Sequence, residues 1–94
     1  MDAQRLAQED FFENETFTDL DLQRADLGQK EFYRCTFQRC QLQESRWKGT
    51  RLEACVFTDC DLSRALLQHT GLREVRFEGS KLMGIDWTSV SPRS

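Results

Sequence analysis

The chain has 94 residues and a formal net charge of −3, and charged residues make up 31% of it. That length allows one domain with one continuous core. Residues 1–10 are polar and acidic, and no stretch approaches the length of a membrane span. The composition therefore argues against a signal peptide and a membrane protein, and we expect a cytoplasmic location.

Residues 1–11 precede a regular apolar pattern and are predicted to form an N-terminal cap. The segment from Ala3 to Phe12 is rich in helix-forming residues. A short helix there could cover the first turn of a repeat structure, whose end would otherwise expose its core and unpaired strand edges.

Every fifth residue from Phe12 to Trp87 is a large apolar one, without exception. A period of five fits neither a helix, at about 3.6, nor a strand, at about 2. It fits a backbone that turns a corner every five residues and points one apolar side chain inward from each side. This phase holds 16 of the 20 Phe, Leu and Trp residues: Phe12, Phe17, Leu22, Leu27, Phe32, Phe37, Leu42, Trp47, Leu52, Phe57, Leu62, Leu67, Leu72, Phe77, Leu82 and Trp87.

The type of apolar residue repeats at a second period of 20, which predicts four sides for each turn of the coil. Like side chains would then stack in columns at the β spacing of about 4.8 Å. We expect an all-β, four-sided parallel coil of about four turns over residues 12–89. The clearest core columns are Phe17, Phe37, Phe57 and Phe77; Leu22, Leu42, Leu62 and Leu82; and Leu27, Trp47, Leu67 and Trp87.

The position two before each large residue, here called the small slot, is mostly small or β-branched. Four of these slots hold cysteine, at residues 35, 40, 55 and 60. This spacing is wider than that of common zinc sites, so compact core filling is the preferred interpretation, with a disulfide or a metal as the alternative. Cys35 would lie above Cys55 and Cys40 above Cys60, as free thiols in a reducing compartment. The exceptions in the small slot are Asp10, Glu15, Leu20 and Lys30.

Catalytic and nucleic-acid chemistry find little support in the sequence. His69 is the only histidine, lies at an outward position and has no companion at ligand or triad spacing. No phosphate-binding loop or nucleophile motif is present. Trp47 and Trp87 point inward by phase, which disfavours base stacking. We expect no enzyme, no cofactor, no metal and no nucleic-acid partner.

Residues 90–94 follow the repeat as a short tail, and nothing comparable to the N-terminal cap covers the last turn. The residues predicted to line that end are Leu72, Phe77, Leu82 and Trp87. Such an apolar end predicts self-association, most simply as a homodimer, unless a C-terminal half is missing.

The five-residue units resemble those of the pentapeptide-repeat proteins. Clear instances are Ala25–Gln29, Cys35–Arg39 and Cys60–Arg64. The resemblance implies a right-handed, four-sided parallel β-helix. It also implies a role like that of the albicidin- and microcin-immunity and quinolone-resistance members. Those proteins act on DNA gyrase or topoisomerase IV as rods that imitate duplex DNA, and this chain resembles their N-terminal half.

The charge distribution argues against a simple DNA mimic, because duplex DNA has a sustained negative field. Residues 17–94 hold 11 acids and 12 bases, and outward charges alternate in sign along the expected columns. An ion-paired surface is the simpler interpretation. A candidate acidic strip for a partner remains at Asp21, Asp26, Asp61 and Asp86. The alternative to a topoisomerase-binding protein is a general scaffold or adaptor, or one half of a longer member.

Overall fold

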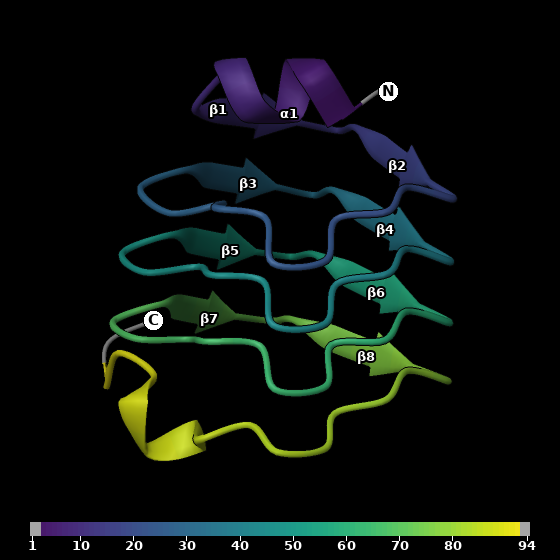
Figure 1. Cartoon of the computed structure of the whole chain (residues 1–94). Coiled ribbons are helices and arrows are strands. Elements are labelled where there is room, and N and C mark those ends of the chain that lie inside the picture. Colours follow the sequence, from purple (N-terminus) through teal and green to yellow (C-terminus); the bar gives the residue numbers. More distant parts are fainter. Residues whose placement is uncertain (1–2, 93–94) are drawn as a thin grey trace.

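The computed structural model describes residues 3–92 (Figure 1). Residues 1–2 of the predicted cap and 93–94 of the predicted tail therefore lie outside the described residues. The chain begins with helix α1 (Ala3–Gln8) and ends with the short 3-10 helix η1 (Trp87–Ser89). Between them lie eight strands of three residues each: β1 (Phe11–Glu13), β2 (Thr16–Thr18), β3 (Glu31–Tyr33), β4 (Thr36–Gln38), β5 (Arg51–Glu53), β6 (Val56–Thr58), β7 (Gly71–Arg73) and β8 (Arg76–Glu78).

The strands form two parallel sheets, and every pairing joins residues twenty positions apart. One sheet has the order β1-β3-β5-β7 and the other β2-β4-β6-β8. Isolated parallel bridges build two further ladders, one from residues 21, 41, 61 and 81 and one from residues 26, 46 and 66. The chain is therefore a parallel β-solenoid. The fourth ladder has only three members and ends at Leu66, so about three turns have all four sides paired.

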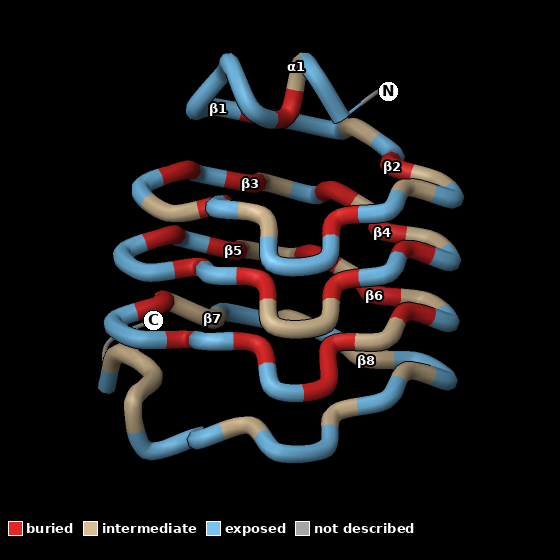
Figure 2. Tube along the Cα trace, in the orientation of Figure 1, coloured by how far each residue is buried: buried red, intermediate tan, exposed pale blue. Residues whose placement is uncertain are grey.

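The core is a set of stacked columns inside this coil. The rings of Phe17, Phe37, Phe57 and Phe77 stack with centroid separations of 4.8, 4.7 and 5.2 Å. The indole of Trp47 meets Phe37 and Phe57 edge-on at 5.8 Å. Leu22, Leu27, Leu42, Leu62 and Leu67 are buried, whereas Leu72, Leu82 and Trp87 are not. Figure 2 shows the buried positions recurring from one turn to the next and disappearing toward the C-terminal end.

Polar side chains in the small slots fill space and also form hydrogen bonds between successive turns. The hydroxyl of Thr50 donates to the carbonyl oxygen of Leu27, and that of Thr70 to the carbonyl oxygen of Trp47, in each case in the preceding turn. The thiol of Cys60 donates in the same way to Phe37. Buried hydroxyl and thiol groups thereby find acceptors without water, which removes the cost of desolvating them unpaired.

Three exceptions in the small slot, Lys30, Asp10 and Glu15, hold the helical cap in place. Lys30 is only 4% exposed, and its ammonium group donates to the carbonyl oxygen of Glu9 at 2.7 Å and to the carboxylate of Asp10 at 3.2 Å. The guanidinium of Arg5 in α1 bonds Glu15 at 2.9 Å. These bonds fix α1 over the first turn, where fully buried Leu6 closes the column ends.

The acid-rich N-terminal segment is consequently ion-paired. Arg5 also bonds Glu9 at 3.0 Å, and Arg34 of the next turn pairs with Glu13. Together with the Asp10 and Glu15 pairs, each acid between residues 3 and 16 has a basic partner. The local excess of negative charge seen in the sequence is therefore largely compensated within the fold.

The coil turns at the second residue after each large one, in the left-handed backbone region. At this position twelve described non-glycine residues, Ala54 among them, have φ between 51 and 59°. Gly49, Gly79 and Gly84 occupy it with φ of 72, 60 and 72°. Holding an L-amino acid other than glycine in this left-handed conformation costs roughly 1–2 kcal/mol. The hydrogen bonds and packing between turns must offset that cost at almost every corner.

Candidate interaction surface

The four carboxylates of the candidate acidic strip all stabilise local turns. Each lies just before a large inward residue, and its Oδ1 accepts the backbone N–H two residues later, as in an Asx turn. The donors to Asp21, Asp26, Asp61 and Asp86 are Gln23, Gly28, Ser63 and Thr88, at 3.2, 3.0, 2.9 and 3.0 Å.

The ladders separate these carboxylates rather than bringing them together. Gln41 lies between Asp21 and Asp61 in one ladder, and Lys81 follows Asp61. In the next ladder Asp26 is followed by the basic Arg46, and Asp86 joins no bridge. The hydroxyl and N–H groups of Ser63 bond Asp61 and hold the pKa of its carboxyl below the usual value. The strip is thus four dispersed, turn-bound carboxylates.

Corner residues form ion pairs along the rod. The guanidinium of Arg39 bonds both oxygens of Asp19, at 2.8 and 3.3 Å, which lowers the pKa of that carboxyl. Glu44 lies between Arg24 and Arg64, at 3.7 and 3.6 Å. Such exposed pairs contribute little stability each, but they cancel the field that either charge would project.

One uncharged face was not foreseen from the sequence. The outward residues of β2, β4 and β6 carry no charge, and the hydroxyl of Thr18 donates to Gln38 at 3.3 Å. The available signal was the run of polar and β-branched residues on either side of the Phe17 column. This uncharged face consists of Thr16, Thr18, Thr36, Gln38, Val56 and Thr58.

The C-terminal end of the coil is open. No residue between 71 and 92 is buried, and Trp87 is 44% exposed. Phe77 stacks on Phe57 and meets Trp87 edge-on at 6.1 Å, while Leu72 and Leu82 are partly exposed. The residues predicted for self-association therefore present both apolar surface and unpaired strand edges. We call Leu72, Phe77, Leu82 and Trp87 the open end.

Other candidate chemistry is sparse in the part of the chain that the structure describes. His69 is exposed, and its backbone N–H donates to the carbonyl oxygen of Ser89. The four cysteines are buried free thiols. Residues 3–92 contain no group of three or more His, Cys, Asp or Glu side chains that could hold a metal ion. No described helix is long and apolar enough to cross a membrane.

Parallel turns that contact only their neighbours, with one large apolar residue every five positions, define a solenoid repeat protein. The chain belongs to the pentapeptide-repeat family, whose repeat-region model matches residues 30–93. No protein of curated function matches it.

Solved structures of QnrB1 share the fold. Full-length QnrB1, a plasmid-mediated fluoroquinolone resistance protein, superposes with a TM-score of 0.76 and 25% identity over 93% of this chain. A trypsin-treated QnrB1 variant gives the same TM-score and identity. Because the aligned region covers 43% and 44% of those two chains, this chain spans less than half their length.

Proposed function

We propose that this chain is a non-enzymatic protein-interaction module whose partner is a type II topoisomerase, DNA gyrase or topoisomerase IV. The observation that supports this most is the likeness to QnrB1, a fluoroquinolone resistance protein, over 93% of the chain at a TM-score of 0.76. Because the likeness covers 93% of the chain, it includes most of the stacked turns and the faces that a partner would contact.

The shape of the rod suits recognition by surface rather than by a cleft. The fold measures 30 × 23 × 21 Å, and aromatic and leucine side chains fill the inside of the coil. We propose that it winds as a right-handed, four-sided β-helix of four coils, so that each side displays residues at steps of about 4.8 Å. A cross-section near that of duplex DNA would let such a rod occupy a DNA-binding channel.

Charge mimicry is the weaker part of this proposal. The pairs Asp19–Arg39 and Glu44–Arg64 leave little sustained negative field along the corners. We therefore propose that the partner recognises the rod mainly by shape, through the uncharged face of β2, β4 and β6. The strip of Asp21, Asp26, Asp61 and Asp86 would contribute local hydrogen bonds.

A supercoiling assay tests the proposal directly. The full chain at micromolar concentration is added to DNA gyrase with relaxed plasmid, with and without a fluoroquinolone. Inhibition of supercoiling, or restored activity in the presence of the drug, is the expected result. A Thr36→Arg variant places charge in the uncharged face without touching the core and should weaken the effect. If the chain neither bound gyrase nor protected it, the proposal of a topoisomerase partner would be refuted, and the alternative of a general scaffold would stand.

The open end favours a second property, self-association into a homodimer. Trp87 and Phe77 leave apolar surface exposed where strand edges are also unpaired. A second copy meeting this end would cover both features, as the next turn does elsewhere in the coil. Sedimentation of the full chain should show a concentration-dependent dimer that Trp87→Glu abolishes. A monomer at all concentrations would contradict this property without bearing on gyrase binding.

A further inference from the structure

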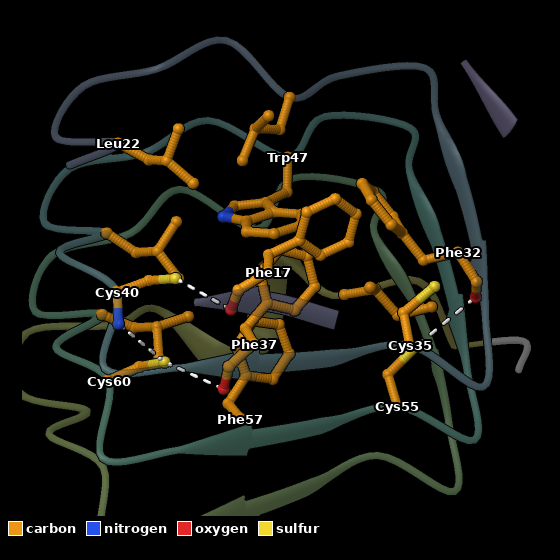
Figure 3. Packing of buried hydrophobic residues seen from close by; sticks show 14 of the residues in the cluster. Phe17, Leu22, Phe32, Cys35, Phe37, Cys40, Trp47, Cys55, Phe57 and Cys60 are labelled. Carbon is orange, nitrogen blue, oxygen red and sulfur yellow. Dashed lines mark hydrogen bonds between the residues drawn. The ribbon is translucent and has the colours of Figure 1, made fainter. Parts of the chain in front are cut away.

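Four cysteine thiols form two stacked pairs in the middle of the coil. Cys35 and Cys55 occupy one column of small slots, and Cys40 and Cys60 the next, each only 0–2% exposed. The first pair lies just before β4 and β6, and the second just after them. Because β4 and β6 pair in register, the thiol pairs flank both ends of that pairing. Figure 3 shows one pair on each side of the stacked phenylalanine rings.

The two thiols of each pair are close enough to influence one another. The partner thiol is the largest cause of the pKa shift of Cys35 and of Cys40. The backbone N–H of Cys40 also donates to the sulfur of Cys60 at 3.5 Å. Paired strands place their Cα atoms about 4.8 Å apart, within the roughly 4.4–6.8 Å that a disulfide spans. The Cα spacing therefore permits a bond between the two sulfurs.

Sulfur is not needed for packing or hydrogen bonding at these slots. Ser80 follows Cys60 in its column, and its hydroxyl donates to the carbonyl oxygen of Phe57 at 2.9 Å. The thiol of Cys60 makes the equivalent bond to Phe37 at 3.2 Å. Val75 follows Cys55 with no polar group at all. What the sulfurs alone add is the ability to form a covalent bond across two turns.

We propose that each pair is an oxidation site that hydrogen peroxide converts into a disulfide joining two successive turns, Cys35–Cys55 and Cys40–Cys60. A thiolate of the pair attacks one peroxide oxygen, so that an S–O bond forms, the O–O bond breaks, and the leaving hydroxide is protonated to water. The second thiol displaces the oxygen of the sulfenic acid and gives its proton to it, releasing a second water. Two thiols lose two electrons, and the peroxide gains them.

The electrostatics and the fold both favour this reaction. Within each pair the partner thiol lowers the pKa of Cys35 and of Cys40 and raises that of Cys55 and of Cys60, so the pair divides into a more acidic and a less acidic thiol. Access is available from the C-terminal side. No described residue from Gly71 onward is buried, so local opening of the β7–β8 turn uncovers Cys55 and Cys60 in the adjacent turn, with their partners Cys35 and Cys40 one turn further in.

Mass spectrometry of the folded full chain tests the proposal. The protein is treated with hydrogen peroxide under native conditions, alkylated and digested with trypsin and with a protease that cleaves before Asp59, which separates Cys55 from Cys60. The expected products are peptides linked as Cys35–Cys55 and Cys40–Cys60, and the unfolding midpoint rises by roughly 10 °C or more until a reductant is added. Free thiols after treatment, links within one turn, or irreversible sulfinic acids alone would overturn the proposal.

Matched variants separate oxidation from packing. Cys35→Ser should remove only the first link and keep the second. Before oxidation its stability should be close to that of the parent, because serine already makes the equivalent small-slot hydrogen bond at Ser80 in the neighbouring column. The Cys35→Ser, Cys40→Ser double variant should show no midpoint shift with peroxide. A shift that persists in the double variant would show that the stabilisation has another cause. None of these readouts depends on topoisomerase binding.

Discussion

Replacing Phe57 by alanine should cost far more stability than the same change at Phe77, although both belong to one column. Phe57 is 1% exposed and stacks on Phe37 at 4.7 Å with rings 6° apart. It also stacks on Phe77 at 5.2 Å and meets Trp47 edge-on. Phe77 is partly exposed and has one stacked neighbour, Phe57, besides an edge-on contact with the exposed Trp87 at 6.1 Å.

The difference can be estimated from these contacts. A buried Phe→Ala change costs about 3–5 kcal/mol, and each aromatic pair adds about 0.5–1.5 kcal/mol beyond area burial. With three aromatic partners, Phe57→Ala should reach the upper part of that range. Phe77→Ala removes a partly exposed ring from a turn that opens locally, and should cost about 1–2 kcal/mol. The gap of about 2 kcal/mol or more is large against a total stability of about 5–15 kcal/mol.

Urea unfolding followed by tryptophan fluorescence measures both variants. At a slope of about 1–3 kcal/mol per molar urea, the two midpoints should differ by about 1 M or more. Equal midpoints, or a lower midpoint for Phe77→Ala, would refute the idea that burial depth along the rod sets the cost. A Phe57→Leu control should lose less, because it keeps most of the apolar volume.

Three further changes probe the cap, the turns and the corners. Lys30→Met should lower stability by about 1–3 kcal/mol and speed amide exchange in α1, since it leaves Asp10 and a backbone carbonyl without their donor, whereas exposed Lys48→Met should not. The folded-state pKa of Asp61 lies below its unfolded value, so its stabilisation is present at neutral pH and is lost as pH falls through the folded-state pKa. Asp61→Asn should therefore flatten the acid limb of a plot of stability against pH, and an unchanged limb would contradict this. Ala54→Gly relieves a residue with φ of 57° and should raise the thermal midpoint, with a gain of up to about 1 kcal/mol; a loss would show that chain entropy dominates.

The parallel coil could be predicted because both of its periods, five and twenty residues, can be seen in the positions of Phe, Leu and Trp alone. A large apolar residue every five positions and a repeat of type every twenty allow few other backbones, and both the family and the parallel solenoid are confirmed. Pairings that depend only on register also follow, such as Glu53 with Arg73 at 3.9 Å. The right-handed sense and the count of four coils stay predictions.

The cap and the turns could not be derived in the same way. Lys30 and Asp10 look like defects in the small slot until the position of α1 is known, because their bond depends on how the chain enters the first turn. The acidic strip was identified from charge alone. The turn-stabilising role of Asp61 depends on the rotamer that carries its oxygen to Ser63, which no periodicity encodes.

The left-handed corners have a consequence for how such a rod can diversify. Since arginine, glutamate, glutamine and alanine all adopt nearly the same φ there, the backbone path is insensitive to the chemistry of the side chain it displays. A corner can thus exchange one sign of charge for another at almost no architectural penalty. Recognition specificity and scaffold stability are therefore largely separable in this molecule, because substitutions at the corner residues alone could create a surface for a new partner.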